Sequence, residues 1–197
     1  MNVLVLVGST RAASYNARMA EAVVAALPAH VAVSRFDLTT LPFYDADADA
    51  AGELGEVVDV FRRGVAAADA IVIATPVYKA AYSGVLKVFL DLLPQSALKG
   101  KTVLPLATGG SPHHMLALDY ALRPVLQSLA ARQILPGVYA TDGQVTLQPE
   151  GAYQLQAELA QRLDEAVDTL ASEGLKPQSP ARWGFEPVAF SQVRCSV

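Results

Sequence analysis

Residues 2–11 read NVLVLVGSTR, a run of Val and Leu that stops at a glycine and continues into a polar loop. A short run that is apolar on both faces is typical of a strand buried inside a parallel sheet. The polar loop extends to Asn16 and leads into an Ala-rich stretch that we expect to be helical as far as Leu27. This strand–loop–helix unit predicts an α/β fold.

The same alternation continues along the chain. We expect further strands at 31–36, 70–74, 102–107 and 134–140, and further helices at 56–68, 83–93, 112–131 and 153–172, with a surface loop at 37–55. Five apolar strands alternating with five helices predict a parallel sheet with helices on both faces. Right-handed crossovers leave few topologies, and the flavodoxin-like strand order 2-1-3-4-5 is a common five-stranded solution. We expect one domain over residues 1–174 and an extended C-terminal tail over 175–197.

Composition excludes several classes of protein. Of the 197 residues, 52% are hydrophobic and 17% are charged, which excludes a disordered chain. The low share of charge indicates surface hidden in an oligomer. A net charge of −4 provides no field that would attract nucleic acid. The single cysteine, Cys195, excludes an internal disulfide and a Cys-based metal site, and the three histidines show no zinc-binding spacing, so we expect no metal.

No run of about 18 residues is apolar and free of charge, so we expect no membrane span. The apolar stretch near Met1 is too short for a signal peptide and has no basic segment before it. We therefore expect a cytoplasmic protein.

Three loops follow the first, third and fourth predicted strands, which are neighbours in the order 2-1-3-4-5. The loops should meet at the carboxyl edge of the sheet, where such folds bind ligands. The first loop carries Ser9, Arg11, Ser14 and Asn16 before a helix, a combination of groups that can surround a phosphate. It has neither Gly-x-Gly-x-x-Gly nor Gly-Lys-Ser/Thr, so it is neither a dinucleotide fingerprint nor a P-loop. The alternative is a polar loop with a capping serine.

The second and third loops offer different surfaces. In the second, Pro76 restricts the backbone, Val77 and Tyr78 can lie against a flat ring, and Ser83 can cap the next helix. The third contains Gly109 and Gly110, which let the backbone approach a ligand closely. Ordinary turns before helices are the alternative in both cases.

Pro124 lies inside the predicted helix 112–131. Proline has no N–H to donate to the carbonyl of Tyr120, and its ring crowds that carbonyl. Single-turn π-bulges often mark functional sites. We therefore predict a distorted helix around Leu118–Tyr120, with a simple proline kink as the alternative.

Three blocks of sequence point to a known family. They are TPVYKAAYSGVLK at 75–87, KTVLPLATGG at 101–110 and DYALRPVL at 119–126. Over residues 1 to about 145 the chain resembles the flavodoxin-like NAD(P)H-dependent FMN reductases, in particular those that serve bacterial alkanesulfonate monooxygenases. The resemblance implies FMN and NADPH or NADH as ligands, and an assembly of two or four subunits with Tyr120 on a π-helix at an interface.

The resemblance also implies roles for the loop residues. Ser9, Arg11, Ser14 and Asn16 would hold the phosphate, and Pro76, Val77, Tyr78 and Lys79 would lie along the isoalloxazine, with Ser83 at the end of the same loop. Thr108, Gly109 and Gly110 would close the other side. Hydride would pass from nicotinamide C4 to flavin N5, chemistry that the cofactor supplies, so no catalytic side chain is expected. Reduced FMN would leave to supply a partner monooxygenase.

Three alternatives remain at this stage. The same fold and loops would serve an FMN-bound quinone, azo-dye or metal-ion reductase, because function lies in the site rather than in the fold. A flavodoxin-type electron carrier is a second alternative, although such carriers are strongly acidic and this chain carries only −4. A non-flavin binding module is the third. The preference between NADPH and NADH stays open.

Overall fold

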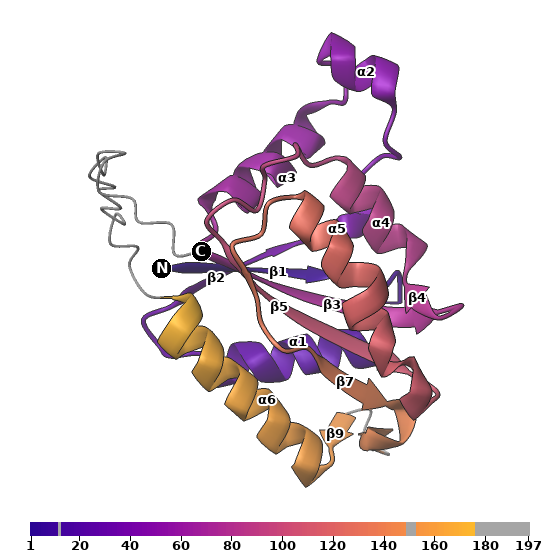
Figure 1. Cartoon of the computed structure of the whole chain (residues 1–197), viewed down its shortest axis with the longest axis vertical. Coiled ribbons are helices and arrows are strands. Elements are labelled where there is room, and N and C mark those ends of the chain that lie inside the picture. The colour runs from indigo at the N-terminus through magenta and orange to yellow at the C-terminus, as the bar shows by residue number, and fades with distance from the viewer. Residues whose placement is uncertain (12, 149–152, 176–197) are drawn as a thin grey trace, which may run out of the picture.

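A central sheet with helices on both faces forms the molecule (Figure 1). The computed structural model describes residues 1–11, 13–148 and 153–175. Parallel strands run in the order β2-β1-β3-β5-β6; β7 also pairs with β5, and β4 pairs antiparallel with β3. The strands are β1 (Asn2–Val7), β2 (Ala32–Phe36), β3 (Ala70–Tyr78), β4 (Ala81–Tyr82), β5 (Thr102–Gly109), β6 (Gln133–Ile134) and β7 (Val138–Thr141). The flavodoxin-like class is confirmed, and the predicted count of five strands is corrected to seven in this sheet.

Two apolar layers hold the helices to the sheet. On one face lie α1 (Tyr15–Ala26) and α6 (Ala157–Thr169), and on the other lie α3 (Glu56–Ala67), α4 (Gly84–Asp91) and α5 (Arg123–Ser128) (Figure 1). Strand β1 serves both layers, because Leu4 and Leu6 pack with α3 and α4 while Val3 and Val5 pack with α1 and α6. Alternating side chains of a buried strand point to opposite faces, which explains its unbroken apolar sequence.

The fifth predicted strand is divided into β6 and β7, which both pair with β5. Pro136 and Gly137 lie between them. Proline cannot donate a hydrogen bond to a ladder, so pairing stops and resumes after it. A Cβ on Gly137 would lie 2.6 Å from Leu118 Cδ1, so the chain passes too close to the neighbouring helix for a side chain.

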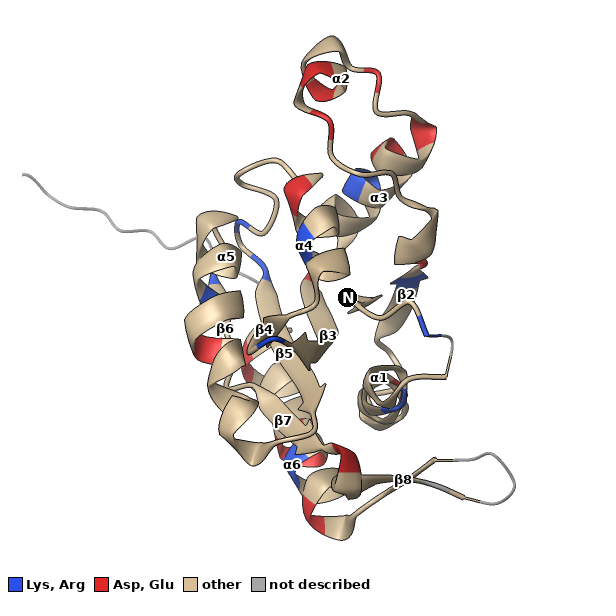
Figure 2. Ribbon diagram, turned by 90° about the vertical axis from the view of Figure 1, so that its right-hand side faces the viewer, with Lys and Arg blue, Asp and Glu red and all other residues tan. Residues whose placement is uncertain are grey.

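The predicted surface loop 37–55 contains helical structure that the sequence analysis missed. A 3₁₀ turn spans Leu38–Thr40, and α2 (Ala46–Ala51) begins at Asp45, whose carboxylate accepts from the N–H groups of Asp47 and Ala48. None of the α2 residues is buried, so no apolar stripe marks the helix. It projects from the rest of the fold and carries acidic side chains (Figure 2).

The predicted helix 112–131 is three pieces: a 3₁₀ helix Pro112–Leu116, a π-helix Leu118–Leu122 and α5. The N–H of Arg123 donates to the carbonyl of Leu118, five residues earlier. Pro124 comes next. It has no N–H, so it cannot donate the α-helical hydrogen bond to the carbonyl of Tyr120. The predicted distortion is confirmed, and the continuous helix is wrong.

The predicted helix 153–172 is also wrong at its start. Tyr153–Leu155 forms strand β9, which pairs antiparallel with β8 (Val145–Leu147), and only then does α6 begin. A π-helix, Leu170–Gly174, ends the segment. Apart from Leu175, the predicted tail 175–197 lies outside the described residues.

Candidate functional site

The second loop is a tight hairpin. Strand β3 does not end at Ala74 as predicted but continues through Pro76, which pairs with Thr108 of β5, and ends at Tyr78. Strand β4 then turns back, with Val77 opposite Tyr82. At the tip, Lys79 and Ala80 have φ angles of 51° and 61°. Left-handed conformations at two non-glycine residues cost free energy, and such conformations gather at functional sites.

Ser83 joins the second loop to the first. Its hydroxyl donates to the carbonyl of Gly8 at 2.6 Å and accepts from the N–H of Leu86, while its own N–H donates to Thr75 Oγ1 at 3.0 Å. The side chain is almost fully buried. Ser83 therefore caps α4 and supports the loops from beneath, rather than lining the space between them.

The first loop leads into the N-terminus of α1. Ser14 caps the helix by accepting from the N–H of Ala17 at 3.1 Å, and Ser9 Oγ accepts from the N–H of Arg11 at 3.3 Å. Asn16 is buried, yet its Oδ1 has no hydrogen-bond partner. A buried polar atom without a partner is costly, which marks Asn16 as a group prepared for a ligand.

The third loop depends on Gly109. A Cβ at this position would lie 2.5 Å from Tyr139 Oη and 3.3 Å from Val77 Cβ. Tyr139 in turn donates a 2.6 Å hydrogen bond to the carbonyl of Ser111. Burial, together with the nearby charge of Asp142, raises the pKa of the Tyr139 phenol, so the group keeps the proton that it donates.

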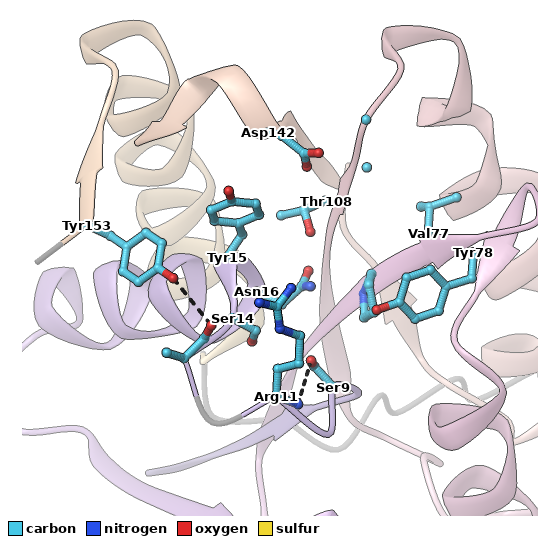
Figure 3. Close-up of a pocket in the computed structure, with 14 residues that line it drawn as sticks. Ser9, Arg11, Ser14, Tyr15, Asn16, Val77, Tyr78, Thr108, Asp142 and Tyr153 are labelled. Atoms are coloured by element: carbon cyan, nitrogen blue, oxygen red, sulfur yellow. Dashed lines mark hydrogen bonds between the residues drawn. The ribbon is translucent and has the colours of Figure 1, made fainter. Parts of the chain in front are cut away.

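One cavity lies between these loops (Figure 3). The predicted site residues in its lining are Ser9, Arg11, Ser14, Asn16, Pro76, Val77, Tyr78, Thr108, Gly109 and Gly110. Lys79, at the exposed hairpin tip, and Ser83, beneath the floor, are not among the lining residues. The sequence analysis missed Ala13, Tyr15, Asp142 and Tyr153, which also line it.

The missed residues lacked a signal in the sequence. Asp142 lies in the turn after β7, and Tyr153 belongs to the strand that was predicted as helix. Tyr15 is the first residue of α1, directly after the capping serine. The sequence pointed to Tyr15 only through its position between Ser14 and Asn16, two residues of the predicted phosphate site.

The two ends of the cavity differ in charge. Among the described lining residues Arg11 is the cation, near Ser9 and Asn16, and Asp142 is the anion, on the opposite side of the cavity (Figure 3). Across residues 1–11, 13–148 and 153–175, no three His, Cys, Asp or Glu side chains gather as metal ligands. Nor is any helix in these ranges long and apolar enough to cross a membrane.

The lining fits a flavin mononucleotide. Two hydroxyls, a guanidinium and the N-terminus of the 12-residue helix α1 match a phosphate, and Asn16 Oδ1 can accept from a ribityl hydroxyl. Pro76, Val77 and the glycine backbone of the third loop form surfaces suited to a flat ring system. The fold and cavity therefore define a flavodoxin-like, mononucleotide-binding protein.

Comparison with known proteins gives the family. The model of the NADPH-dependent FMN reductase family matches residues 1–146, and the chain belongs to this family. The FMN reductase (NADPH) of Escherichia coli K12 is 55% identical over 109 residues, 55% of this chain and 56% of that protein. The NADH-dependent FMN reductase SfnE of Pseudomonas putida is 35% identical over 147 residues, 74% of this chain and 79% of that protein.

A solved structure agrees with these relatives. The apo form of the NADH:FMN oxidoreductase EMOB superposes with a TM-score of 0.73 at 36% identity, covering 89% of this chain and 91% of that one. The chain spans a little over half the length of the first curated relatives it matches, 56% and 57%.

Proposed function

We propose that this chain is an NAD(P)H-dependent FMN reductase that supplies reduced FMN to a partner monooxygenase, such as one acting on alkanesulfonates. The observation that carries the proposal is the cavity between the three loops, which has Ser9, Arg11 and the N-terminus of α1 at one end and Pro76, Val77 and the backbone of Gly109 and Gly110 at the other. Family membership supports the activity, and the relatives include both NADPH- and NADH-dependent FMN reductases.

In this proposal the phosphate of FMN is held by Ser9, Arg11, Ser14 and the amide N–H group of Asn16, whose Oδ1 is left for a ribityl hydroxyl. The ring lies along Pro76, Val77 and Tyr78, with Thr108, Gly109 and Gly110 on the other side and Lys79 at the rim. FMN accepts hydride at N5 from nicotinamide C4, so the protein need not supply an acid or a base. The task of the side chains is to bind FMN, to orient it and to leave one ring face open to the nicotinamide.

FMN in this scheme is an exchangeable substrate. Tyr78, which borders the ring-binding end, is 58% exposed, so that end of the cavity is open. An open site supports release of reduced flavin to a partner.

We further propose that residues 1–174 form the reductase domain and that it works in the cytoplasm, where NAD(P)H is supplied, as a dimer or tetramer. Exposed Met115, Leu116 and Tyr120, on and beside the π-helix, support the oligomer. Apolar side chains grouped on a surface are typical of interfaces.

An absorption spectrum of the purified chain, followed by NADPH and NADH oxidation with and without FMN, tests the proposal. We expect a colourless protein that oxidises the nucleotide only when FMN is added. The competing function is an FMN-bound quinone, azo-dye or metal-ion reductase, which the open ring-binding end also favours because a second flat acceptor can reach it. A yellow protein that keeps FMN through gel filtration and reduces quinones would establish that function instead.

A further inference from the structure

Tyr153 of β9 rests on the start of α1 (Figure 3). Its ring meets that of Tyr15 edge to face, with centroids 5.6 Å apart and planes at 88°. Its hydroxyl donates to the carbonyl of Ala13 at 3.3 Å. Two contacts therefore connect one tyrosine with the residues on either side of Ser14, and all four of these residues line the cavity.

Arg18 holds the same ring from another direction. Its guanidinium carbon lies 5.2 Å from the centroid of the Tyr153 ring, in range for a cation–π interaction. The guanidinium is paired with Glu21 through Nη1, and its Nε is buried without a hydrogen-bond partner. The face of the Tyr153 ring thus gives this cation a favourable contact beside its ion pair with Glu21.

Among its described residues, 9–11, 13 and 14, the loop that Tyr153 contacts has few side-chain hydrogen bonds of its own. There, the side chains of Ser9 and Ser14 each accept one hydrogen bond from a backbone N–H, at 3.3 and 3.1 Å. A loop that must become ordered when its ligand arrives loses binding free energy to conformational entropy, and a loop already held in place does not. The hairpin β8–β9 provides that restraint from outside the loop.

We propose that Tyr153 is a positioning residue that holds residues 13–15 in their phosphate-binding arrangement, so that it sets how strongly the phosphate of FMN contributes to binding. This inference rests on the proposed function. It concerns a residue outside the 1–146 segment that the family model matches. Tyr153 acts on the phosphate end of the cavity and not on the ring end.

Titration of the full chain with FMN and with riboflavin, followed by quenching of flavin fluorescence, tests the proposal. Riboflavin has the same ring and no phosphate. For Tyr153→Ala we expect the Kd for FMN to rise about tenfold, while the Kd for riboflavin stays within about twofold. Tyr153→Phe keeps the ring contacts and should bind FMN within about twofold of the unmodified chain. Tyr44→Ala, two residues before the projecting helix α2, is the matched control and should change neither Kd.

Tyr153→Leu repeats the test with an apolar side chain that suits a strand, in case the alanine variant fails to fold; melting temperatures identify such a failure. An unchanged Kd for FMN in both variants would overturn the inference. Equal loss of FMN and riboflavin would also overturn it, because it would show a general structural role. If the unmodified chain binds neither FMN nor riboflavin, the proposed function itself fails. This outcome differs from a failure of the inference, in which the unmodified chain binds flavin and only the expected effect of the Tyr153 variants is missing.

Discussion

The hydroxyl of Ser83 donates a 2.6 Å hydrogen bond to the carbonyl of Gly8, 75 residues earlier in the chain. The same oxygen accepts from the N–H of Leu86, so one buried atom caps a helix and holds two loops together. A Cβ on Gly8 would lie 3.1 Å from this oxygen and 2.9 Å from Leu86 Cβ, which keeps the approach free of side chains. Ser83 therefore fixes the first and second loops, which both line the cavity, relative to each other.

Ser83→Ala should reduce the free energy of unfolding by about 1–3 kcal/mol, because it leaves a buried carbonyl without this donor and α4 without its cap. Urea unfolding at equilibrium measures the change. Ser128→Ala is the control, since the exposed Ser128 hydroxyl donates to the Val125 carbonyl at 2.8 Å in a comparable bond. We expect the control to change stability by less than about 0.5 kcal/mol. Equal effects of the two substitutions would contradict the role assigned to Ser83.

Gly109→Ala should weaken FMN binding and lower stability, by about 1–3 kcal/mol in unfolding free energy, because the new methyl group displaces Tyr139 from Ser111. Flavin fluorescence titration and urea unfolding measure the two effects. Gly110→Ala is the neighbouring control: its Cβ would have ordinary contact with Asp142 Oδ2 at 3.5 Å. Equal effects of the two substitutions would show that the close approach of Gly109 to Tyr139 contributes neither to stability nor to FMN binding.

Arg11→Gln should weaken FMN binding by about 10- to 100-fold, since a hydrogen bond to a charged group contributes about 1.5–3 kcal/mol. Riboflavin, which lacks the phosphate, should bind as before. The FMN affinity of the unmodified chain should also fall with added salt more steeply than that of the variant. Arg35→Gln, on the exposed part of the edge strand β2, controls for general loss of charge. If Arg11→Gln weakened the binding of FMN and of riboflavin equally, the phosphate would not lie against Arg11.

Because of Lys101, the free energy of unfolding should rise with pH in the alkaline range. Its amino group donates to the carbonyls of Ala66 and Ala68, and burial lowers its pKa below the usual 10.5, with the charge of Asp69 opposing the shift. Between the folded and unfolded pKa values the unfolded chain binds more protons, so the free energy of unfolding increases as pH rises toward 10.5.

Urea unfolding at about pH 8 and about pH 10 measures this rise. Lys101→Met should remove it, whereas Lys99→Met, at an exposed position, should leave it in place. A rise of the same size in Lys101→Met would assign the pH dependence to another group.

Local sequence was sufficient for the parallel core. The apolar runs of β1, β3 and β5 are buried on both faces, so their composition alone marks them. The crossover rule leaves few topologies, and the common flavodoxin-like order is one of them. Because strand order brings three loops to one edge, most of the cavity lining followed as well. Pro124 predicted the distorted helix because the missing N–H is a property of one residue, independent of its surroundings.

What local sequence could not supply depends on contacts between distant segments. Tyr153 lies in a strand because Val145–Leu147 pairs with it, and no pattern within 153–172 reveals that partner. Ser83 points beneath the cavity because the Gly8 carbonyl accepts a hydrogen bond from its hydroxyl there. Composition and periodicity show which residues favour exposure to solvent and which favour burial, and they identified the layers and the loops. Direction, pairing and close approach are long-range properties, and they arise only when the folded chain brings those residues together.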